Sequence, residues 1–341
     1  MRNRTLAFAA LAGVCVVAAV VAAVVAITGA RGDRQAAEQA VTKARPKAEE
    51  ILDSGKPFAV FRIVDKAHAE TLGRLSIASV ENGKPGAIVP AGPSCSRVAF
   101  GAGKGICLDL LGTQMAVRLL DARMQPVTNF ELAGIPSRAR ISPDGRWGGV
   151  TAFVVGHAYA APGEFSTATT IIDMNAGKPL ADLEKDFTVT DQGKVVNARD
   201  RNYWGLTFAD DGDTFYATLA TGDRTWLIKG SIAKRRAETI HENVECPSLS
   251  PDGTRVGYKK AVSRNPTQWR FHVLDLATGK ETPLSETRSV DDQLAWLDND
   301  HLLYSDGEQT WVVNADGSGE PTVWLPATDS PTVQENVGTA P

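Results

Sequence analysis

Hydrophobic and polar positions alternate in short runs along most of the chain, as they do in β-strands with one buried face. The run before Asp275 is the clearest, because Trp269, Phe271 and Val273 fall on one side and polar or charged residues lie between them. No helical spacing of useful length interrupts residues 58–326. The pattern predicts an all-β domain.

A tight turn followed by a short strand recurs through this region. Ser-Pro-Asp-Gly begins at Ser142 and again at Ser250, and looser versions follow Phe208 and Trp296. In such a turn Pro presets φ, Asp bonds nearby backbone N–H groups, and Gly takes a positive φ without a steric penalty. The turns therefore mark equivalent places in a structural repeat.

The other half of the repeat is a strand that ends in a polar residue before a short turn. These polar residues are Ser79, Asp121, Asp173, Lys229, Asp275 and Asn314. Their successive spacings of 42, 52, 56, 46 and 39 residues suit units of four strands. The chain is therefore predicted to form a six-bladed β-propeller, with seven blades as an alternative if the terminal segments each form a partial blade.

Two of the repeats carry a family resemblance. Pro-Ser-Leu-Ser-Pro-Asp-Gly at residues 247–253 and Asn-Ala-Asp-Gly-Ser-Gly at 314–319 resemble the WD40-like repeat of the TolB-type six-bladed propellers. The resemblance covers about residues 58–326, although the full turn motif is present in only two repeats. It implies a non-enzymatic propeller that serves as a docking platform in the cell envelope. TolB itself has an α/β domain before its propeller, so the same partners are not implied here.

The N-terminus has a different pattern. Arg2 and Arg4 precede an uncharged run, and its residues 6–28 number 23, enough to cross about 30 Å of hydrocarbon as a helix. The basic end favours a cytoplasmic N-terminus and an exported remainder. We expect a retained signal anchor, with secretion after cleavage near residues 28–30 as the alternative.

These patterns divide the chain into five predicted parts. They are a cytoplasmic basic end at 1–5, a transmembrane helix at 6–28, a charged juxtamembrane spacer at 29–56 broken by Pro46, the propeller at 57–327, and a disordered tail at 328–341.

Cysteine use agrees with export. Cys95 and Cys107 flank a short strand-turn-strand stretch, so they are candidates for a disulfide in an oxidising compartment. The alternative is that both are small buried hydrophobic residues.

Several function classes lack their sequence signals. The net charge of −4 is spread along the chain, which argues against nucleic acid as a partner. No Gly-x-Ser-x-Gly elbow occurs, and the five histidines are scattered without metal-ligand spacing. We therefore predict no catalytic residues, no metal site and no cofactor.

Blade geometry predicts where a binding site would lie. Strand direction alternates, so the tight turns share one face and the long connections 156–167, 184–201 and 259–268 share the other. Loops enlarged on a rigid scaffold are common binding sites. The candidate binding residues there are Tyr159, Phe165, Tyr203, Trp204 and Asn265. The alternative is that these side chains only pack their own loops.

The sequence thus predicts a non-catalytic propeller at the outer side of the cytoplasmic membrane that binds a protein or peptide of the cell envelope. The alternative function is a propeller enzyme of lyase or hydrolase type, or a small-ligand sensor, that uses the central channel.

Overall fold

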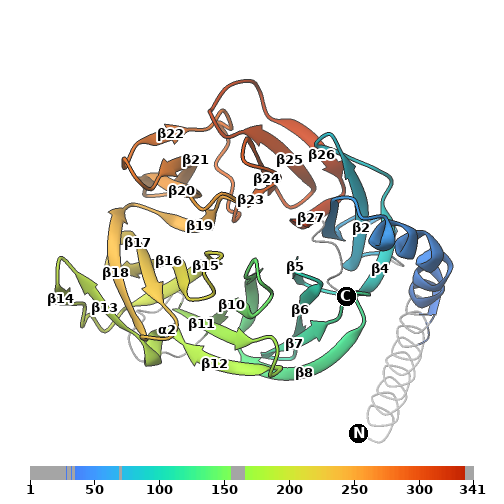
Figure 1. Cartoon of the computed structure of the whole chain (residues 1–341), viewed down its shortest axis with the longest axis horizontal. Helices are drawn as coiled ribbons and strands as arrows, with labels where there is room; N and C mark the ends of the chain where they lie inside the picture. The colour runs from blue at the N-terminus through green and yellow to red at the C-terminus, as the bar shows by residue number, and fades with distance from the viewer. Residues whose placement is uncertain (1–27, 29–31, 33–34, 69–70, 155–165, 335–341) are drawn as a thin grey trace, which may run out of the picture.

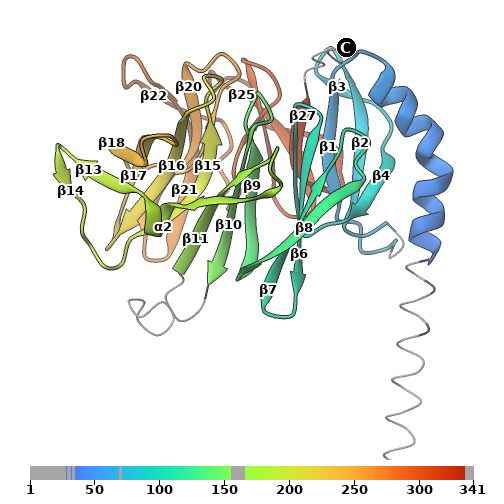
Figure 2. The same ribbon diagram turned by 60° about the horizontal axis from the view of Figure 1, so that its bottom comes forward.

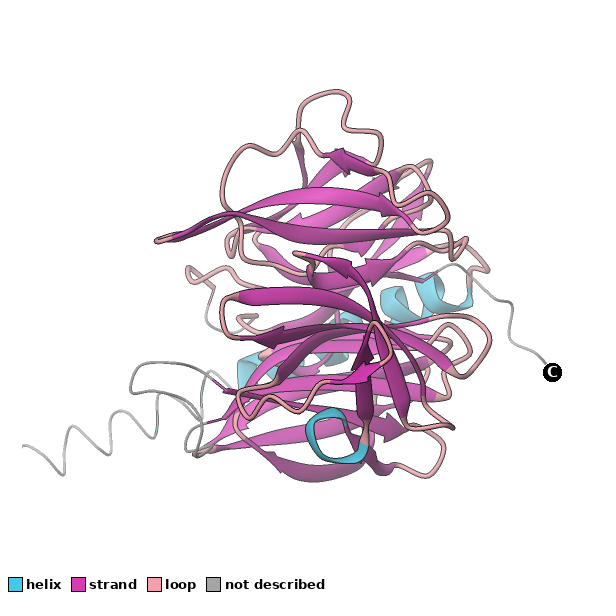
Figure 3. Cartoon of the chain, turned by 90° about the vertical axis from the view of Figure 1, so that its left-hand side faces the viewer, coloured by secondary structure: helices cyan, strands magenta, loops and turns pink. Residues whose placement is uncertain are grey.

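The computed structural model describes residues 28, 32, 35–68, 71–154 and 166–334. These residues form six β-sheets arranged radially about a common axis, which confirms the six-bladed propeller (Figure 1). Each blade has four antiparallel strands, here called a to d from the axis outward. Figure 3 shows the same sheets from the side.

The first three blades follow one another along the chain from the point of ring closure. Blade 1 holds β27 (Thr328–Gln334), β1 (Phe58–Ile63), β2 (Arg74–Glu81) and β4 (Val89–Ser94), with the short β3 (Lys84–Pro85) paired to β2. Blade 2 holds β5 (Arg97–Gly101), β6 (Lys104–Leu111), β7 (Gln114–Leu120) and β8 (Pro126–Ala133). Blade 3 holds β9 (Ile135–Ile141), β10 (Trp147–Val154), β11 (Ser166–Asp173) and β12 (Lys178–Asp182).

The last three blades include one insertion. Blade 4 holds β15 (Asn202–Phe208), β16 (Thr214–Thr221), β17 (Arg224–Ser231) and β18 (Arg236–Glu242), extended at its outer edge by β13 (Thr188–Asp191) and β14 (Lys194–Val195). Blade 5 holds β19 (Glu245–Leu249), β20 (Arg255–Arg264), β21 (Thr267–Asp275) and β22 (Glu281–Pro283). Blade 6 holds β23 (Ala295–Trp296), β24 (His301–Ser305), β25 (Gln309–Asn314) and β26 (Thr322–Pro326).

The repeated polar residue has a physical role at the end of strand c. Asp173 Oδ1 accepts hydrogen bonds from the backbone N–H groups of Asn175 at 2.9 Å and Ala176 at 2.8 Å. The carboxylate of Asp275 binds the turn after β21 in the same way. These bonds satisfy N–H groups that the sheet leaves unpaired, which explains why the period was visible in the sequence.

The hydrophobic core lies between neighbouring blades. Phe215 and Leu219 of β16 are fully buried, and they pack with Trp147 and Ile171 of blade 3. Each sheet buries residues on both faces in this way, so no blade can hide its apolar surface alone. The ring must close for the core to be complete.

The C-terminal segment corrects one prediction. Residues 328–334 are not a disordered tail but form β27, the innermost strand of blade 1, paired antiparallel with β1. The segment is polar because it faces the axis, and its backbone hydrogen bonds come from a strand at the other end of the chain. Residues 335–341 lie outside the described residues.

A helix over residues 35–53 precedes the propeller and packs against its outer side (Figure 2). Ala48 is buried, and Ile51 and Leu52 pack on the core of blade 1 and its neighbour. The helix continues through Pro46, contrary to the predicted break, although this residue removes one N–H group from the helical ladder.

No helix among the described residues is long and apolar enough to span a bilayer. Apart from Thr28, the predicted transmembrane segment 6–28 lies outside those residues.

Candidate functional site

The propeller has two distinct faces. The turn face carries the connections from strand a to b and from c to d, including the two Ser-Pro-Asp-Gly turns. The loop face carries the connections from b to c and from each blade to the next. Residues 184–201 form the connection from blade 3 to blade 4, and of residues 156–167 all but the last two lie outside the described residues. Residues 259–268, however, are not a long loop, because β20 and β21 extend through them as a hairpin.

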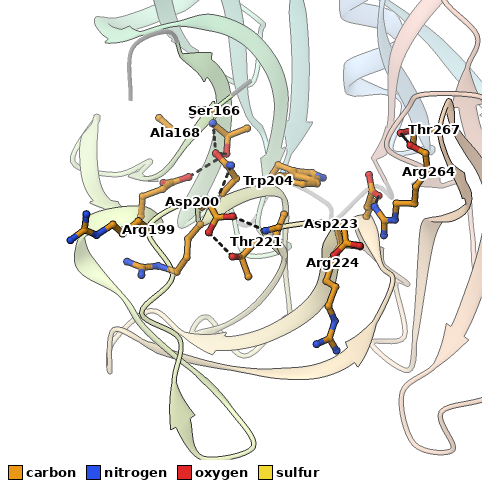
Figure 4. Close-up of a pocket in the computed structure, with 18 of the residues that line it drawn as sticks. Ser166, Ala168, Arg199, Asp200, Trp204, Thr221, Asp223, Arg224, Arg264 and Thr267 are labelled. Carbon is orange, nitrogen blue, oxygen red and sulfur yellow. Dashed lines mark hydrogen bonds and ion pairs between the residues drawn. The ribbon is translucent and has the colours of Figure 1, made fainter. Parts of the chain in front are cut away.

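A cavity of about 690 Å³ lies on the loop face, between blades 3, 4 and 5 (Figure 4). Its wall combines residues of β11, the connection after β12, and the hairpin ends of blades 4 and 5. These are the blades beside which the sequence predicted the binding loops.

The predicted binding residues fall in different places. Trp204 lines the cavity and is half-buried. Tyr203 is only 1% exposed and packs in the core between blades 3 and 4, so its side chain has no surface to offer a partner. Asn265 is exposed at the tip of the β20–β21 hairpin, between the cavity residues Arg264 and Thr267. Tyr159 and Phe165 lie outside the described residues.

One wall of the cavity carries a buried carboxyl group from α2 (Leu183–Asp186), a single helical turn capped by Asp182. The turn presents Glu184 to β11, where its Oε2 accepts a hydrogen bond from Thr169 N at 3.0 Å. Burial raises the pKa of Glu184 well above its usual range, against the opposing effect of the Thr169 bond. The carboxyl therefore keeps its proton to unusually high pH and can donate as well as accept.

A second carboxyl group, that of Asp200, holds together two segments that line the cavity. Asp200 accepts hydrogen bonds from Thr221 Oγ1 at 2.6 Å and from Gly222 N at 2.7 Å. The bond from Thr221, followed by that from Gly222, lowers the pKa of Asp200, so this group stays ionised. The contacts join the connection before β15 to the β16–β17 hairpin.

The wall from blade 5 holds an aromatic ring against a third carboxyl group. Glu245 is 6% exposed, and its Oε2 accepts a hydrogen bond from Trp269 Nε1 at 3.0 Å. Arg264 Nη1 lies 3.6 Å from Glu245 Oε1. The ammonium of Lys259 sits 4.5 Å from the centroid of the Trp269 ring, a cation–π contact that fixes the ring plane.

The cavity thus offers charges of both signs and two tryptophan rings on a rigid frame. Its described lining includes no histidine or cysteine. Among the described residues, no group of three or more His, Cys, Asp or Glu side chains could hold a metal ion.

The axis of the ring is crossed by side chains. Arg140 of β9 donates to the carbonyl of Leu294 at 2.7 Å, and Arg138 donates to the carbonyl of Asp291 at 3.2 Å. Blades 3 and 6 stand opposite each other, so these contacts join opposite sides of the ring (Figure 1). At this level the axis is filled by protein, which favours the loop-face cavity over the central channel as the binding site.

The predicted disulfide is confirmed. Cys95 and Cys107 are bonded, with their Cα atoms 5.3 Å apart, and the bridge links the segment after β4 to β6. Cys246 is a free, buried thiol.

Sequence reasoning missed Glu184, Asp200, Glu245 and Trp269. Asp182 followed three residues later by Lys185 gave only a weak sign of a capped helical turn, and Trp269 had been assigned to the apolar side of a strand. The sequence does not indicate that blades 3 and 5 line one cavity, because their proximity depends on the curvature of the ring.

Comparison with known proteins supports the fold. No known family model matches the chain, and no curated protein shows detectable sequence similarity. TolB from Acinetobacter baumannii is similar with a TM-score of 0.57 at 16% identity, over 82% of this chain and 67% of that one. A nidogen/laminin complex structure gives a TM-score of 0.52 at 12% identity, over 81% and 98%. A putative TolB from Agrobacterium tumefaciens gives 0.45 at 11%, over 80% and 90%. Identities this low show the shared propeller fold alone.

Proposed function

We propose that this chain is a non-catalytic propeller of the cell envelope that binds a polypeptide segment in the loop-face cavity. The observation that carries the proposal is the composition of that cavity: fixed carboxyl groups, arginines and the rings of Trp204 and Trp269 around about 690 Å³. A peptide presents charges, amides and apolar side chains together, which matches this mixture. A purely apolar ligand would displace water from the charged groups of the wall without offering them hydrogen bonds in return.

The TolB-like fold supports the same class of function, since the family resemblance implies a docking platform. The disulfide between Cys95 and Cys107 supports an oxidising compartment. With the basic end and apolar run of residues 1–28, these features support a single-pass protein whose propeller lies outside the cytoplasmic membrane.

The proposal is tested by selecting peptides from a random 12-residue display library on the immobilised, detergent-solubilised full chain. We expect the selected peptides to bind Trp204→Ala at least tenfold more weakly than the unchanged chain, measured by fluorescence anisotropy, because that change removes an aromatic wall. Lys178→Ala, on the turn face of blade 3, is the matched control and should bind normally. Peptides that bind Trp204→Ala as well as the unchanged chain would place the site elsewhere.

A second pair of variants examines the proton on Glu184. Glu184→Gln keeps a neutral acceptor for Thr169 N and should bind the selected peptides within about twofold of the unchanged chain. Glu184→Ala loses that acceptor and should bind at least fivefold more weakly. If Glu184→Gln were as weak as Glu184→Ala, the ligand would require an ionised carboxylate there.

A further inference from the structure

The loop face has an apolar rim on blades 2 and 3, consisting of Leu110, Leu111 and Ile135. These side chains are 47%, 57% and 49% exposed, which is high for residues of this size. The segments that carry them have no charged residue of their own, since residues 110–116 read Leu-Leu-Gly-Thr-Gln-Met-Ala and 132–136 read Leu-Ala-Gly-Ile-Pro, although Asp109 and Glu131 directly precede the two segments. The three apolar side chains can therefore enter an apolar medium only to the depth at which Asp109 and Glu131, at their margin, stay hydrated.

Strand register makes the rim continuous. Leu111 pairs with Gln114 across the β6–β7 hairpin, and Gln114 pairs in turn with Ala133 at the end of β8. Ile135 begins β9 two residues later, next to the end of β10. The exposed side chains thus follow one edge of two neighbouring blades instead of being scattered over the surface.

Corresponding connections on other blades are charged. The β16–β17 turn contains Asp223 and precedes Arg224, the β20–β21 turn follows Arg264, and the β24–β25 turn contains Asp306 and Glu308. Strand position alone therefore does not explain the apolar rim. The rim lies on blades 2 and 3, and blade 2 shares with blade 1 the core against which the N-terminal helix packs.

The N-terminal helix begins on the same side of the propeller as the rim. Glu38, near its start, lies close enough to Arg74 to stabilise the positive charge of its guanidinium. Arg74 is the first residue of β2 and lies at the loop face. At the other end Asp53 forms a 2.8 Å ion pair with Arg123 in the β7–β8 turn of the turn face. Figure 2 shows the same orientation, with the start of the helix on the side where the β6–β7 hairpin projects.

The chain before this helix restricts the distance to a membrane. The apolar run ends at residue 28 and the described helix is continuous from residue 35, so seven Cα–Cα steps separate them. Even fully extended, that stretch spans only about 25 Å. If residues 6–28 cross the bilayer, the loop face cannot stand far from its surface. So short a tether gives a weak apolar contact a high effective concentration.

We propose that the apolar rim of Leu110, Leu111 and Ile135 rests in the interface of the bilayer that the N-terminal segment enters. This inference rests on the membrane tether of the proposed function, and is independent of what occupies the cavity. The rim enters the region of the acyl chains, while the charged hairpins of blades 4 and 5 stay in water. The cavity then opens toward the membrane surface, so its ligand is a segment lying close to the bilayer.

The test uses the full chain with Cys15→Ser, reconstituted into phosphatidylcholine vesicles whose acyl chains carry bromine. A bimane label is placed at Leu111→Cys; the buried Cys246 and the Cys95–Cys107 disulfide leave no other exposed thiol among the described residues. Ala277→Cys, exposed on the turn face, is the matched control. We expect brominated lipid to quench the label at residue 111 by at least half and the label at 277 by less than a tenth.

Different outcomes separate the tether from the rim. A chain that floats with the vesicles but shows equal quenching at 111 and 277 would overturn the rim contact and leave the tether standing. Failure to float would overturn both, whereas the peptide affinities measured in detergent would be unaffected. Protection of residue 111 by dimer formation, seen by light scattering without bromine quenching, would assign the rim to a second copy of the chain.

A further variant tests whether the rim side chains cause the expected quenching. Leu110→Ser with Leu111→Ser should reduce the quenching of a label at Ile135→Cys at least twofold without changing flotation. Raising the salt concentration to 1 M should leave quenching at residue 111 unchanged, because the contact is apolar. Release by salt would show that charges hold this face at the membrane.

Discussion

At the scale of single residues, Glu281 shows how one carboxylate can join two blades. It accepts hydrogen bonds from Tyr258 OH at 2.6 Å and from His241 Nε2 of blade 4 at 2.9 Å, and it also pairs with Lys260. Burial raises the pKa of Glu281, but the bonds from Lys260, Tyr258 and His241 outweigh burial and lower the pKa to about 2.

The sign of this shift predicts a pH dependence. A carboxyl group with a depressed pKa stabilises the fold above its unfolded pKa, near 4.5, and that stability is lost as the pH falls toward 2. Glu281→Gln should therefore lower the free energy of unfolding at pH 7 by about 2 kcal/mol and flatten its decline between about pH 5 and 2. Urea unfolding across this range measures both. Glu131→Gln, an exposed carboxyl of β8, is the control and should change neither.

The residue scale also shows where sequence analysis stops. Trp204 was predicted to face a ligand and does line the cavity, but its neighbour Tyr203 points into the core. Adjacent residues of a strand face opposite sides, so at most one of them could serve. Sequence alternation shows that the two differ, but not which one faces outward, because both sides of a blade are packed against something.

At the scale of elements, the turn chemistry was the reliable signal. Ser142 and Asp144 bind each other and the backbone of the β9–β10 turn, and Ser250 and Asp252 repeat the arrangement in blade 5. Local hydrogen bonds of this kind depend on a few consecutive residues, so the sequence reveals them. By contrast, β13 was unpredictable because it pairs in parallel with β18, more than forty residues away.

The N-terminal helix gives a prediction at this scale. Pro46 lies inside the helix, is exposed, and removes an N–H group that would otherwise bond to a carbonyl one turn earlier. Pro46→Ala should stabilise the helix by up to about 3 kcal/mol, because alanine restores the bond and relieves the ring clash. Hydrogen exchange of the amides in residues 35–53 should slow at least tenfold. Lys47→Ala, also exposed, should slow it by less than threefold.

At the scale of the whole molecule, ring closure depends on the last described strand. Asp329 of β27 forms hydrogen bonds to Arg62 Nε at 3.0 Å and to Arg97 Nη1 at 3.2 Å, joining the two ends of the propeller. Thr328 is fully buried and bonds Thr310 at 2.8 Å between their hydroxyl groups. The sequence predicted six blades correctly but not which segment completes the first, since β27 has no apolar alternation.

Truncation after Ala327 should therefore be severe. We expect loss of cooperative thermal unfolding, followed by circular dichroism, because β1 loses its inner partner and two arginines lose their shared carboxylate. Replacing residues 328–334 by a Gly-Ser segment of equal length should not restore cooperativity. Full recovery with that segment would show that any backbone can close the ring.

This closure has a consequence for biosynthesis. Phe58 pairs with Gln334, so the strand that completes the first sheet is made more than 260 residues after the strand with which it pairs. Until the ribosome has released that segment, blade 1 keeps an unsatisfied inner edge and the interior stays accessible to water and to other chains. A nascent propeller of this kind needs protection until that strand has emerged, and a stop codon before residue 328 would leave the rest of the polypeptide without a stable ring.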